Sequence, residues 1–215
     1  MDFCKDSLYL YAVTDRAWVG KQTLLEQIED ALIGGATMLQ LREKMLDDYA
    51  FIEEAIEVKK LCERYHVPLI INDNVDVALK SGADGVHVGI EDAPVAEIRK
   101  RVGRDFIIGA TAKTVEQARL AEASGADYLG VGAVFPSPTK KQAIRITMKQ
   151  LREICDSVTI PAVAIGGIDL SNVEELTGSG IDGIAVVSAI FAAEEIQKTT
   201  KQLKKSAMSL IENRR

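Results

Sequence analysis

Four short tripeptides of similar sequence recur along this chain, and each separates a helix-like stretch from a short apolar run. Their first glycines are 47, 43 and 55 residues apart. A recurring period of that size is typical of repetitive architecture. If the repeat unit is two β/α modules, four units give eight parallel strands, so the sequence predicts an α/β fold, a TIM (β/α)8 barrel. The four tripeptides are Gly35-Ala36-Thr37, Gly82-Ala83-Asp84, Gly125-Ala126-Asp127 and Gly180-Ile181-Asp182.

Apolar strand-like runs alternate with helix-like stretches along the whole chain. Strands that are apolar on both faces are typical of a parallel sheet covered by helices. No linker or low-complexity segment interrupts the pattern, so residues 1–215 are expected to form one barrel domain. Strands are expected at 8–13, 37–41, 68–71, 85–88, 106–109, 128–131, 162–165 and 184–187. Helices are expected at 23–33, 48–65, 75–80, 94–101, 115–124, 148–155, from Ser171, and at 193–212.

The net charge and the cysteine content limit which partners the protein can bind and which cellular compartment it is expected in. The formal net charge is −6, so the overall field repels nucleic acid and anionic membranes, and neither is expected as a partner. No apolar stretch approaches the roughly 20 residues of a membrane-spanning helix, and the first residues lack a signal-peptide pattern. Three widely separated cysteines favour a reducing, cytoplasmic location. The sequence leaves homo-oligomer formation open.

Polar residues follow the second expected strand, in the order Gln40-Leu41-Arg42-Glu43-Lys44. Alternate residues of a strand share a face, so Gln40, Arg42 and Lys44 are expected to point together toward the barrel mouth. Two cations there are suited to hold a polyanionic small-molecule substrate. The plainer interpretation is a solvated charge pair.

Carboxylates follow the next two expected strands. Asp73 lies directly after the third strand, and Glu91 and Asp92 lie in the loop after the fourth. Asp residues at strand ends are frequently turn formers or helix caps. Two carboxylates from adjacent loops also fit Mg²⁺, which takes few protein oxygens and completes its shell with water and substrate phosphate.

The last two strands are followed by features typical of phosphate binding. Gly166 and Gly167 follow the seventh strand, and Val187 and Ser188 follow the eighth. In this fold, the loops at those positions commonly bind a phosphate through backbone amides. The irregular segment 135–147 suits a mobile active-site loop or a merely long connection.

Two histidines receive no role. His87 lies within an apolar run and fits a hydrogen-bonded core residue, while His66 fits a surface residue. No nucleophile with a neighbouring base is evident, which disfavours covalent catalysis.

The ordered set of these segments resembles the thiamine phosphate synthase family. The resemblance runs from the first expected strand to the eighth. It implies a Mg²⁺-dependent transferase that joins hydroxymethylpyrimidine diphosphate to hydroxyethylthiazole phosphate, or its carboxylated form, with release of pyrophosphate. The segments that carry the resemblance are 11–15, 40–44, 71–73, 85–89, 135–140, 164–168 and 185–190.

The resemblance also implies roles for individual residues. Asp73 and Asp92 would hold Mg²⁺, and Lys140 would contact the diphosphate. Thr111 stands where the family usually has Ser. The residues implied to bind the pyrimidine diphosphate are Gln40, Leu41, Arg42, Glu43, Lys44 and Asn72. Those implied to bind the thiazole phosphate are Ser137, Thr139, Gly167, Val187 and Ser188. Those expected to carry the catalysis are Arg42, Lys44, Lys140 and Thr111.

The sequence departs from the family at two loop positions. Pro138 separates Ser137 from Thr139, which match a family Thr-x-Thr pair, and Gln142 stands where Asp is common. Neither departure removes an expected cation or metal ligand. The mechanism implied by the resemblance is dissociative: diphosphate leaves first, and the thiazole nitrogen captures a pyrimidine-methyl cation. That chemistry needs charge neutralisation and positioning rather than a strong base.

Two alternatives remain open. Thiazole tautomerase relatives share the fold but commonly carry His at a position where this chain has Ala133. A non-catalytic phosphate-binding regulator is the other alternative. An assay for pyrophosphate release distinguishes the regulator from the transferase.

Overall fold

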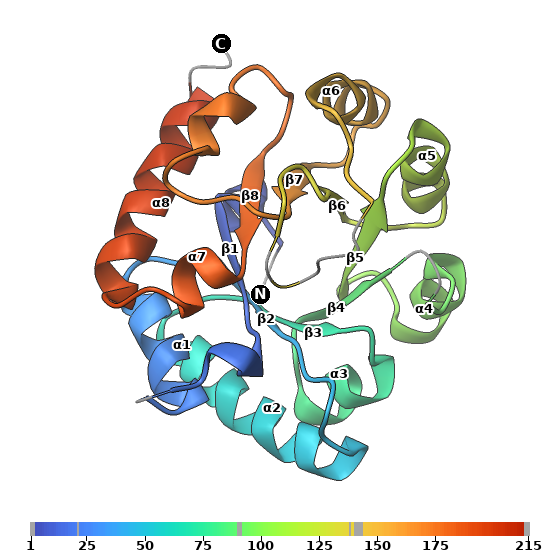
Figure 1. Cartoon of the computed structure of the whole chain (residues 1–215). Helices are drawn as coiled ribbons and strands as arrows, with labels where there is room; N and C mark the ends of the chain where they lie inside the picture. The colour runs from blue at the N-terminus through green and yellow to red at the C-terminus, as the bar shows by residue number, and fades with distance from the viewer. Residues whose placement is uncertain (1–2, 21, 90–91, 138, 140–143, 213–215) are drawn as a thin grey trace.

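The structure is a computed structural model that describes residues 3–20, 22–89, 92–137, 139 and 144–212. Eight strands close into a barrel in sequence order (Figure 1), which confirms the predicted fold. Each strand is parallel to its neighbours, and β1 closes the ring by pairing with both β2 and β8. The strands are β1 Leu10–Val13, β2 Met38–Leu41, β3 Leu69–Asn72, β4 Gly85–Val88, β5 Ile107–Ala112, β6 Tyr128–Gly132, β7 Ala162–Ile165 and β8 Gly183–Val186.

Helices surround the barrel as an outer ring (Figure 1). In the part of the chain that the structure describes, no helix is long and apolar enough to cross a membrane. The α-helices are α1 Leu24–Ile33, α2 Asp48–Arg64, α3 Val75–Ser81, α4 Val95–Val102, α5 Val115–Ala123, α6 Met148–Asp156, α7 Ser188–Phe191 and α8 Ile196–Glu212. Short 3-10 turns are η1 Lys5–Leu8, η2 Arg16–Trp18 and η3 Val173–Leu176.

Side-chain caps explain where several helices begin. A side-chain oxygen of the residue before each helix accepts the backbone N–H three residues later. In α1 and α6, Glu26 and Gln150 also bond back to the capping residue, which completes a capping box. Such caps satisfy backbone donors that the first turn leaves unpaired. The capping residues are Thr23, Asp47, Asn74, Thr114 and Thr147.

The prediction of a helix from Ser171 is wrong. Local side-chain bonds hold that segment in turns, because the Asp169 carboxylate accepts the backbone N–H of Ser171 and the Asn172 side chain accepts that of Asp169. Such bonds compete with regular helix formation, and only η3 forms. The sequence also missed α7, which follows β8 directly.

Strand residues alternate between two cores. Inward side chains fill the barrel, with Tyr11, Met38 and Tyr128 fully or almost fully buried there. Outward side chains such as Leu39 and Leu41 pack against the surrounding helices. A strand residue's parity therefore determines whether its side chain can reach the barrel interior and mouth.

The repeated tripeptides lie where a helix turns back into an even-numbered strand. Their glycines all have positive φ, from 71° to 99°, which favours glycine because it lacks a Cβ. In three repeats the N–H of the following alanine bonds to a helix carbonyl five residues earlier, at 3.0–3.1 Å. This is the hydrogen bond of a Schellman helix end. The repeat thus ends a helix and starts a strand.

The third residue of each tripeptide forms what we call a strand clamp with the preceding odd strand. Its backbone N–H donates to a carbonyl near the start of that strand, and its side chain accepts the N–H of the same residue. The side-chain distances are 2.7–2.9 Å. The clamps join Thr37 to Leu10, Asp84 to Leu69, Asp127 to Ile108, and Asp182 to Ala162.

Each acidic clamp also holds a cation. Lys59 of α2 contacts Asp84 at 2.8 Å, and Arg99 of α4 contacts Asp127 at 2.6 Å. Lys5 of η1 contacts Asp182 at 2.6 Å. The amino-terminal rim of the barrel, where the strands begin, is therefore organised by charges that bond to backbone and to helices.

Candidate functional site

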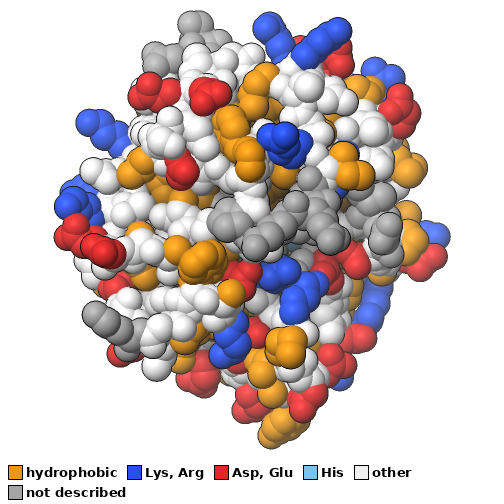
Figure 2. Space-filling view, in the orientation of Figure 1, with side chains coloured by type: hydrophobic (Ala, Val, Ile, Leu, Met, Phe, Trp, Pro, Cys, Tyr) orange, Lys and Arg blue, Asp and Glu red, His pale blue; other side chains and the backbone are white. Residues whose placement is uncertain are grey.

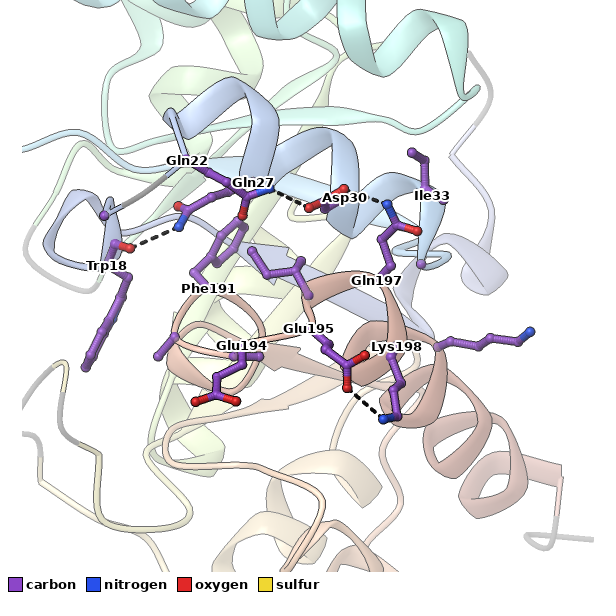
Figure 3. A pocket seen from close by; sticks show the side chains of 16 residues that line it. Trp18, Gln22, Gln27, Asp30, Ile33, Phe191, Glu194, Glu195, Gln197 and Lys198 are labelled. Carbon is purple, nitrogen blue, oxygen red and sulfur yellow. Dashed lines mark hydrogen bonds and ion pairs between the residues drawn. The ribbon is translucent and has the colours of Figure 1, made fainter.

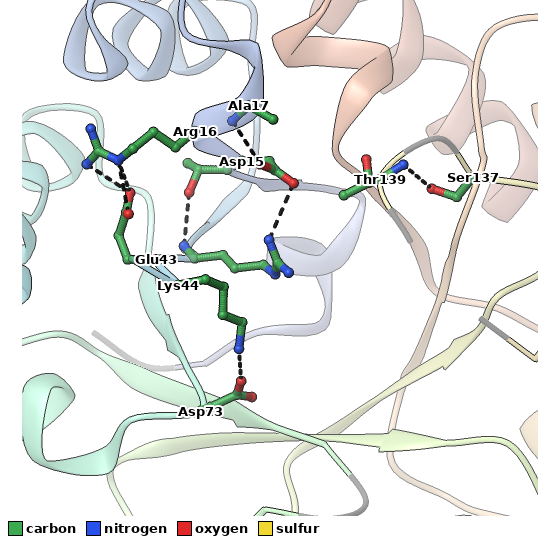
Figure 4. A network of polar contacts seen from close by, with 10 residues as sticks. Asp15, Arg16, Ala17, Glu43, Lys44, Asp73, Ser137 and Thr139 are labelled. Carbon is green, nitrogen blue, oxygen red and sulfur yellow. Dashed lines mark hydrogen bonds and ion pairs between the residues drawn. The ribbon is translucent and has the colours of Figure 1, made fainter. Parts of the chain in front are cut away.

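The carboxyl-terminal rim, where the strands end, gathers polar side chains from several loops. Figure 4 shows Lys44 in contact with Asp73, close to Asp15, which forms an ion pair with Arg42. In the space-filling view, lysine and arginine side chains lie beside acidic ones close to the centre of the face (Figure 2). The predicted convergence of charges from the loops after β2 and β3 is therefore present.

Arg42 leans toward the loop after β1. Its Nη1 lies 3.3 Å from an oxygen of Asp15, and its backbone N–H donates to the Thr14 hydroxyl at 2.9 Å. The side chain of Arg42 is 30% exposed. Asp15, a residue after β1 to which the sequence analysis gave no role, thus positions the guanidinium, which remains accessible to an anionic substrate.

Lys44 leans the other way, toward the loop after β3. Its Nζ lies 2.6 Å from one oxygen of Asp73, and the other oxygen of Asp73 accepts a hydrogen bond from Asn72 at 2.7 Å. Asp73 has φ of 62°, an uncommon conformation for a residue other than glycine. Unusual backbone geometry of this kind clusters at functional sites.

Leu41 and Glu43 do not present their side chains to the mouth. Leu41 is fully buried in the outer core. The Glu43 carboxylate accepts two hydrogen bonds from the Nε of Arg16, at 3.1 and 3.0 Å, and these bonds raise the pKa of Arg16. Neither side chain is therefore available to a substrate.

The two predicted metal ligands lie in the loops after adjacent strands. Asp92 accepts the Gly89 N–H at 2.6 Å, directly after β4, and the N–H of Asp73 donates to the His87 carbonyl of β4 at 2.9 Å. Glu91 lies outside the described residues. Among the residues that are described, no three His, Cys, Asp or Glu side chains gather as a metal-binding group. Two carboxylates suit Mg²⁺, which keeps several waters.

Gln40 and Thr111 face the barrel interior below the mouth. Gln40 is 5% exposed and donates to the Tyr11 hydroxyl at 2.7 Å. The Thr111 hydroxyl lies 3.1 Å from Nε2 of His87. The sequence analysis missed Tyr11, although its inward parity in β1 could have placed it near Gln40.

The loops after β6 and β7 are joined by backbone hydrogen bonds. The N–H groups of Val134 and Phe135 donate to the carbonyls of Ile165 and Gly166, at 3.0 and 2.9 Å. A Cβ on Gly167 would lie 2.2 Å from the Pro136 carbonyl oxygen, so only glycine fits there. This close approach brings the predicted phosphate-binding glycine against the segment that carries Ser137.

Ser137 and Thr139 lie together in that segment, where the Thr139 N–H donates to the Ser137 hydroxyl at 3.3 Å. The Thr139 hydroxyl is buried and has no hydrogen-bond partner among the described residues. Val187 and Ser188 lie at the start of α7. Lys140, Pro138 and Gln142 lie outside the described residues.

A surface cavity of about 1260 Å³ lies away from the mouth, between α1 and the turn from α7 to α8 (Figure 3). Its polar groups bond to one another: Asp30 accepts from Gln22 and Gln197, at 2.7 and 2.6 Å. None of the predicted site residues is among the described residues that line it. The charge network of the mouth, rather than this cavity, therefore marks the candidate site.

Comparisons with known proteins show the family of this chain. The family model described as "Thiamine monophosphate synthase" matches residues 10–190. Thiamine-phosphate synthase of Clostridium botulinum is 47% identical over 195 residues, which cover 91% of this chain and 92% of that protein. The Clostridium beijerinckii protein of the same name is 48% identical over 195 residues, covering 91% and 93%.

A solved structure shares both fold and sequence. Thiamine phosphate pyrophosphorylase from Pyrococcus furiosus superposes with a TM-score of 0.89 at 40% identity, covering 96% of this chain and 98% of that one. These matches confirm the resemblance that the sequence motifs indicated, and they confirm the prediction of an enzyme of this type. The chain belongs to the thiamine monophosphate synthase family.

Proposed function

We propose that this enzyme transfers a pyrimidine-methyl group from hydroxymethylpyrimidine diphosphate to the nitrogen of hydroxyethylthiazole phosphate. The products are thiamine phosphate and pyrophosphate. Above all, the contact between Lys44 and Asp73 supports the proposal, since it joins a cation and a carboxylate across neighbouring loops at 2.6 Å. Such a pair can exchange its internal contact for a diphosphate and its counter-ion.

The reaction proposed here is dissociative. The bond between the methylene carbon and the diphosphate oxygen breaks first, and its electron pair leaves with the diphosphate. The ring amino group stabilises the resulting methylene cation, and the thiazole nitrogen lone pair then forms the new carbon–nitrogen bond. Arg42 and Lys44 would neutralise the leaving group from two sides of the mouth, because they lean toward β1 and β3 respectively.

Mg²⁺ is part of the proposal, with Asp73 and Asp92 as its protein ligands. The donor set fits, because both are carboxylates in loops that follow adjacent strands. When bound, the ion would neutralise further charge on the diphosphate. Asn72, which donates to Asp73 at 2.7 Å, would hold that carboxylate in place.

The acceptor site is proposed on the opposite side of the mouth. Ser137 and Thr139 would donate hydroxyl hydrogen bonds to the thiazole phosphate, and Gly167, Val187 and Ser188 would offer backbone N–H groups. The buried Thr139 hydroxyl supports this assignment, because among the described residues it has no partner. Lys140 would contact the diphosphate. We place the reaction in the cytoplasm, as the cysteine pattern of the sequence suggested.

The direct test supplies both substrates with Mg²⁺ and measures pyrophosphate and thiamine phosphate. We expect both products to form. Hydroxyethylthiazole phosphate and its carboxylated form are compared as acceptors, because the sequence does not distinguish between them. Pyrophosphate release without thiamine phosphate, or no reaction at all, would contradict the proposal; the latter favours a phosphate-binding regulator. Conversion between thiazole isomers in the same mixture would favour a tautomerase.

Lys140→Ala separates the leaving-group role from acceptor binding. We expect kcat to fall by about 100-fold, the effect of removing one charge-stabilising donor, while the Kd of thiazole phosphate changes little. Single-turnover rates and calorimetric titration measure the two quantities. If kcat and the affinity for thiazole phosphate fell by the same factor, Lys140 would instead belong to the acceptor site.

A further inference from the structure

A chain of side-chain hydrogen bonds crosses the barrel interior from β2 to β5. Gln40 Nε2 donates to the Tyr11 hydroxyl at 2.7 Å, and the hydroxyls of Tyr11 and Tyr128 lie 2.9 Å apart. The Tyr128 hydroxyl lies 3.1 Å from His87 Nδ1, and His87 Nε2 lies 3.1 Å from the Thr111 hydroxyl. The two ends of the chain are residues predicted to contact substrate, and the three middle residues have no assigned role.

The barrel makes room for this chain. A Cβ on Gly109 would lie 2.3 Å from the Tyr128 hydroxyl and 2.4 Å from His87 Nδ1. A Cβ on Gly130 would lie 2.9 Å from His87 Cε1. Two inward strand positions must therefore be glycine to hold the rings. The chain is a built feature of the core and not an incidental contact.

Burial keeps the two phenols in one protonation state. Burial raises the pKa of both Tyr11 and Tyr128, so each is a phenol with a single proton. Tyr11 and Tyr128 are at most 1% exposed, so water does not compete for the hydrogen bond between their hydroxyls.

One proton on each phenol makes the chain directional. Tyr11 accepts from Gln40, so its own proton goes to Tyr128, the other partner of its hydroxyl. The Tyr128 proton then goes to His87 Nδ1, which must carry a lone pair. A histidine with a lone pair on Nδ1 carries its proton on Nε2, and that N–H donates to the Thr111 hydroxyl. The Thr111 proton is left to donate elsewhere.

We propose that Tyr11, Tyr128 and His87 are positioning residues that fix Thr111 as a hydrogen-bond donor to the substrate ring. The direction of the chain also leaves the Gln40 side-chain oxygen as an acceptor. These two ends match a heteroaromatic ring that offers a nitrogen lone pair to Thr111 and an amino N–H to Gln40. Identifying that ring as the aminopyrimidine rests on the proposed function. The direction of the chain does not.

The direction can be measured in the free enzyme. The whole polypeptide contains two histidines, His66 and His87. In protein labelled with 15N-histidine, a His66→Asn variant assigns both spectra. We expect the Nε2–H tautomer at His87 at neutral pH, and the Nδ1–H tautomer or a charged ring would overturn the proposal.

Gln40→Glu is the sharper variant. A carboxylate only accepts, so Tyr11 would donate to it, every proton in the chain would reverse, and His87 would switch to Nδ1–H. An unchanged tautomer in this variant would contradict a continuous chain. Because neither experiment uses a substrate, both remain decisive even if the wild-type enzyme fails the synthase assay.

Tyr128→Phe tests the consequence for the substrate. It removes one hydroxyl and keeps the ring that packs edge-on against Tyr11, with centroids 5.9 Å apart. We expect kcat/KM for the pyrimidine substrate to fall roughly tenfold, the loss expected for one hydrogen bond, while KM for thiazole phosphate stays constant.

Tyr65→Phe is the matched control, because the Tyr65 hydroxyl bonds to Glu29 outside the barrel, at 3.0 Å. It should leave kcat/KM unchanged. Equal effects of the two substitutions, or a loss in Tyr128→Phe shared by both substrates, would reduce Tyr128 to a structural role.

Discussion

The two rims of the barrel use the same residue types for opposite purposes. At the amino-terminal rim, Asp84 bonds to the Leu69 backbone and to Lys59, whose side chain is only 15% exposed. At the carboxyl-terminal rim, Lys44 and Asp73 bond to each other across two loops, and Lys44 is 51% exposed. A lysine–aspartate pair is thus a structural tie at one end and an exchangeable contact at the other.

The difference follows from what each carboxylate satisfies. If an aspartate that accepts a buried strand N–H turned toward a ligand, that backbone N–H would lose its hydrogen-bond acceptor. An exposed ion pair contributes little to folding because water and salt screen it. The carboxyl-terminal rim can therefore give its charges to a ligand at little cost in stability. This difference between the rims agrees with the general rule that one face of such barrels serves stability and the other serves catalysis.

Substituting each of the two lysines by alanine should distinguish the roles of the two rims most clearly. Lys44→Ala is expected to lower kcat/KM by about 100- to 1,000-fold, because one donor to the leaving group is lost, with little change in Tm. Lys59→Ala should lower Tm and leave kcat/KM near the wild-type value. Steady-state kinetics and thermal unfolding check both variants. If both lysines affected the same quantity, the proposed division would fail.

Removing a clamp aspartate should be the largest effect on folding. Asp84→Ala leaves the Leu69 N–H without its side-chain acceptor and the Lys59 ammonium with only Glu63, at 3.6 Å, so we expect a loss of about 2–4 kcal/mol in the free energy of unfolding. Asp84→Asn keeps an acceptor for the N–H and should lose less. Urea unfolding measures both, and equal losses would show that the charge alone matters.

Substitution of the carboxylates at the carboxyl-terminal rim should change the Mg²⁺ requirement instead of the stability. Asp73→Ala or Asp92→Ala is expected to raise the Mg²⁺ concentration for half-maximal activity by about tenfold or more. Asp84→Asn serves as the control from the amino-terminal rim and should leave that concentration unchanged. An unchanged Mg²⁺ titration in the Asp73 and Asp92 variants would remove them from the metal site.

The clamp that lacks a charge should give the smallest effect. Thr37→Val deletes a hydroxyl that accepts from the Leu10 N–H at 2.8 Å while keeping the side-chain volume. We expect a loss of about 1 kcal/mol in unfolding free energy and unchanged kinetics. A loss as large as that of Asp84→Ala would mean that the cations add nothing to the clamps.

The barrel was predictable because its determinants are local and repeated. Tripeptides such as Gly82-Ala83-Asp84 carry a helix end, a strand start and a clamp within three residues. The prediction of a helix from Ser171 failed because side-chain bonds of Asp169 and Asn172 replaced it with turns. Pattern alone does not weigh such bonds against helix formation.

The site was only partly predictable, because strand alternation holds only while the chain is a strand. β2 ends at Leu41, and beyond it Arg42 and Lys44 lean toward different neighbours, Asp15 and Asp73. The interior chain was missed because its members lie on different strands. Two strand glycines, Gly109 and Gly130, were the available signal, since glycine inside a strand often marks a close approach.

The clamps also define how the ring is assembled. Each one ties an odd strand to the next even strand, so the barrel consists of four βαβ modules that are joined to one another by strand pairing and helices. The cation at the last module comes from Lys5, at the opposite end of the chain. That contact joins the first and fourth modules, so a break in the backbone between α4 and β5 would leave all four modules intact.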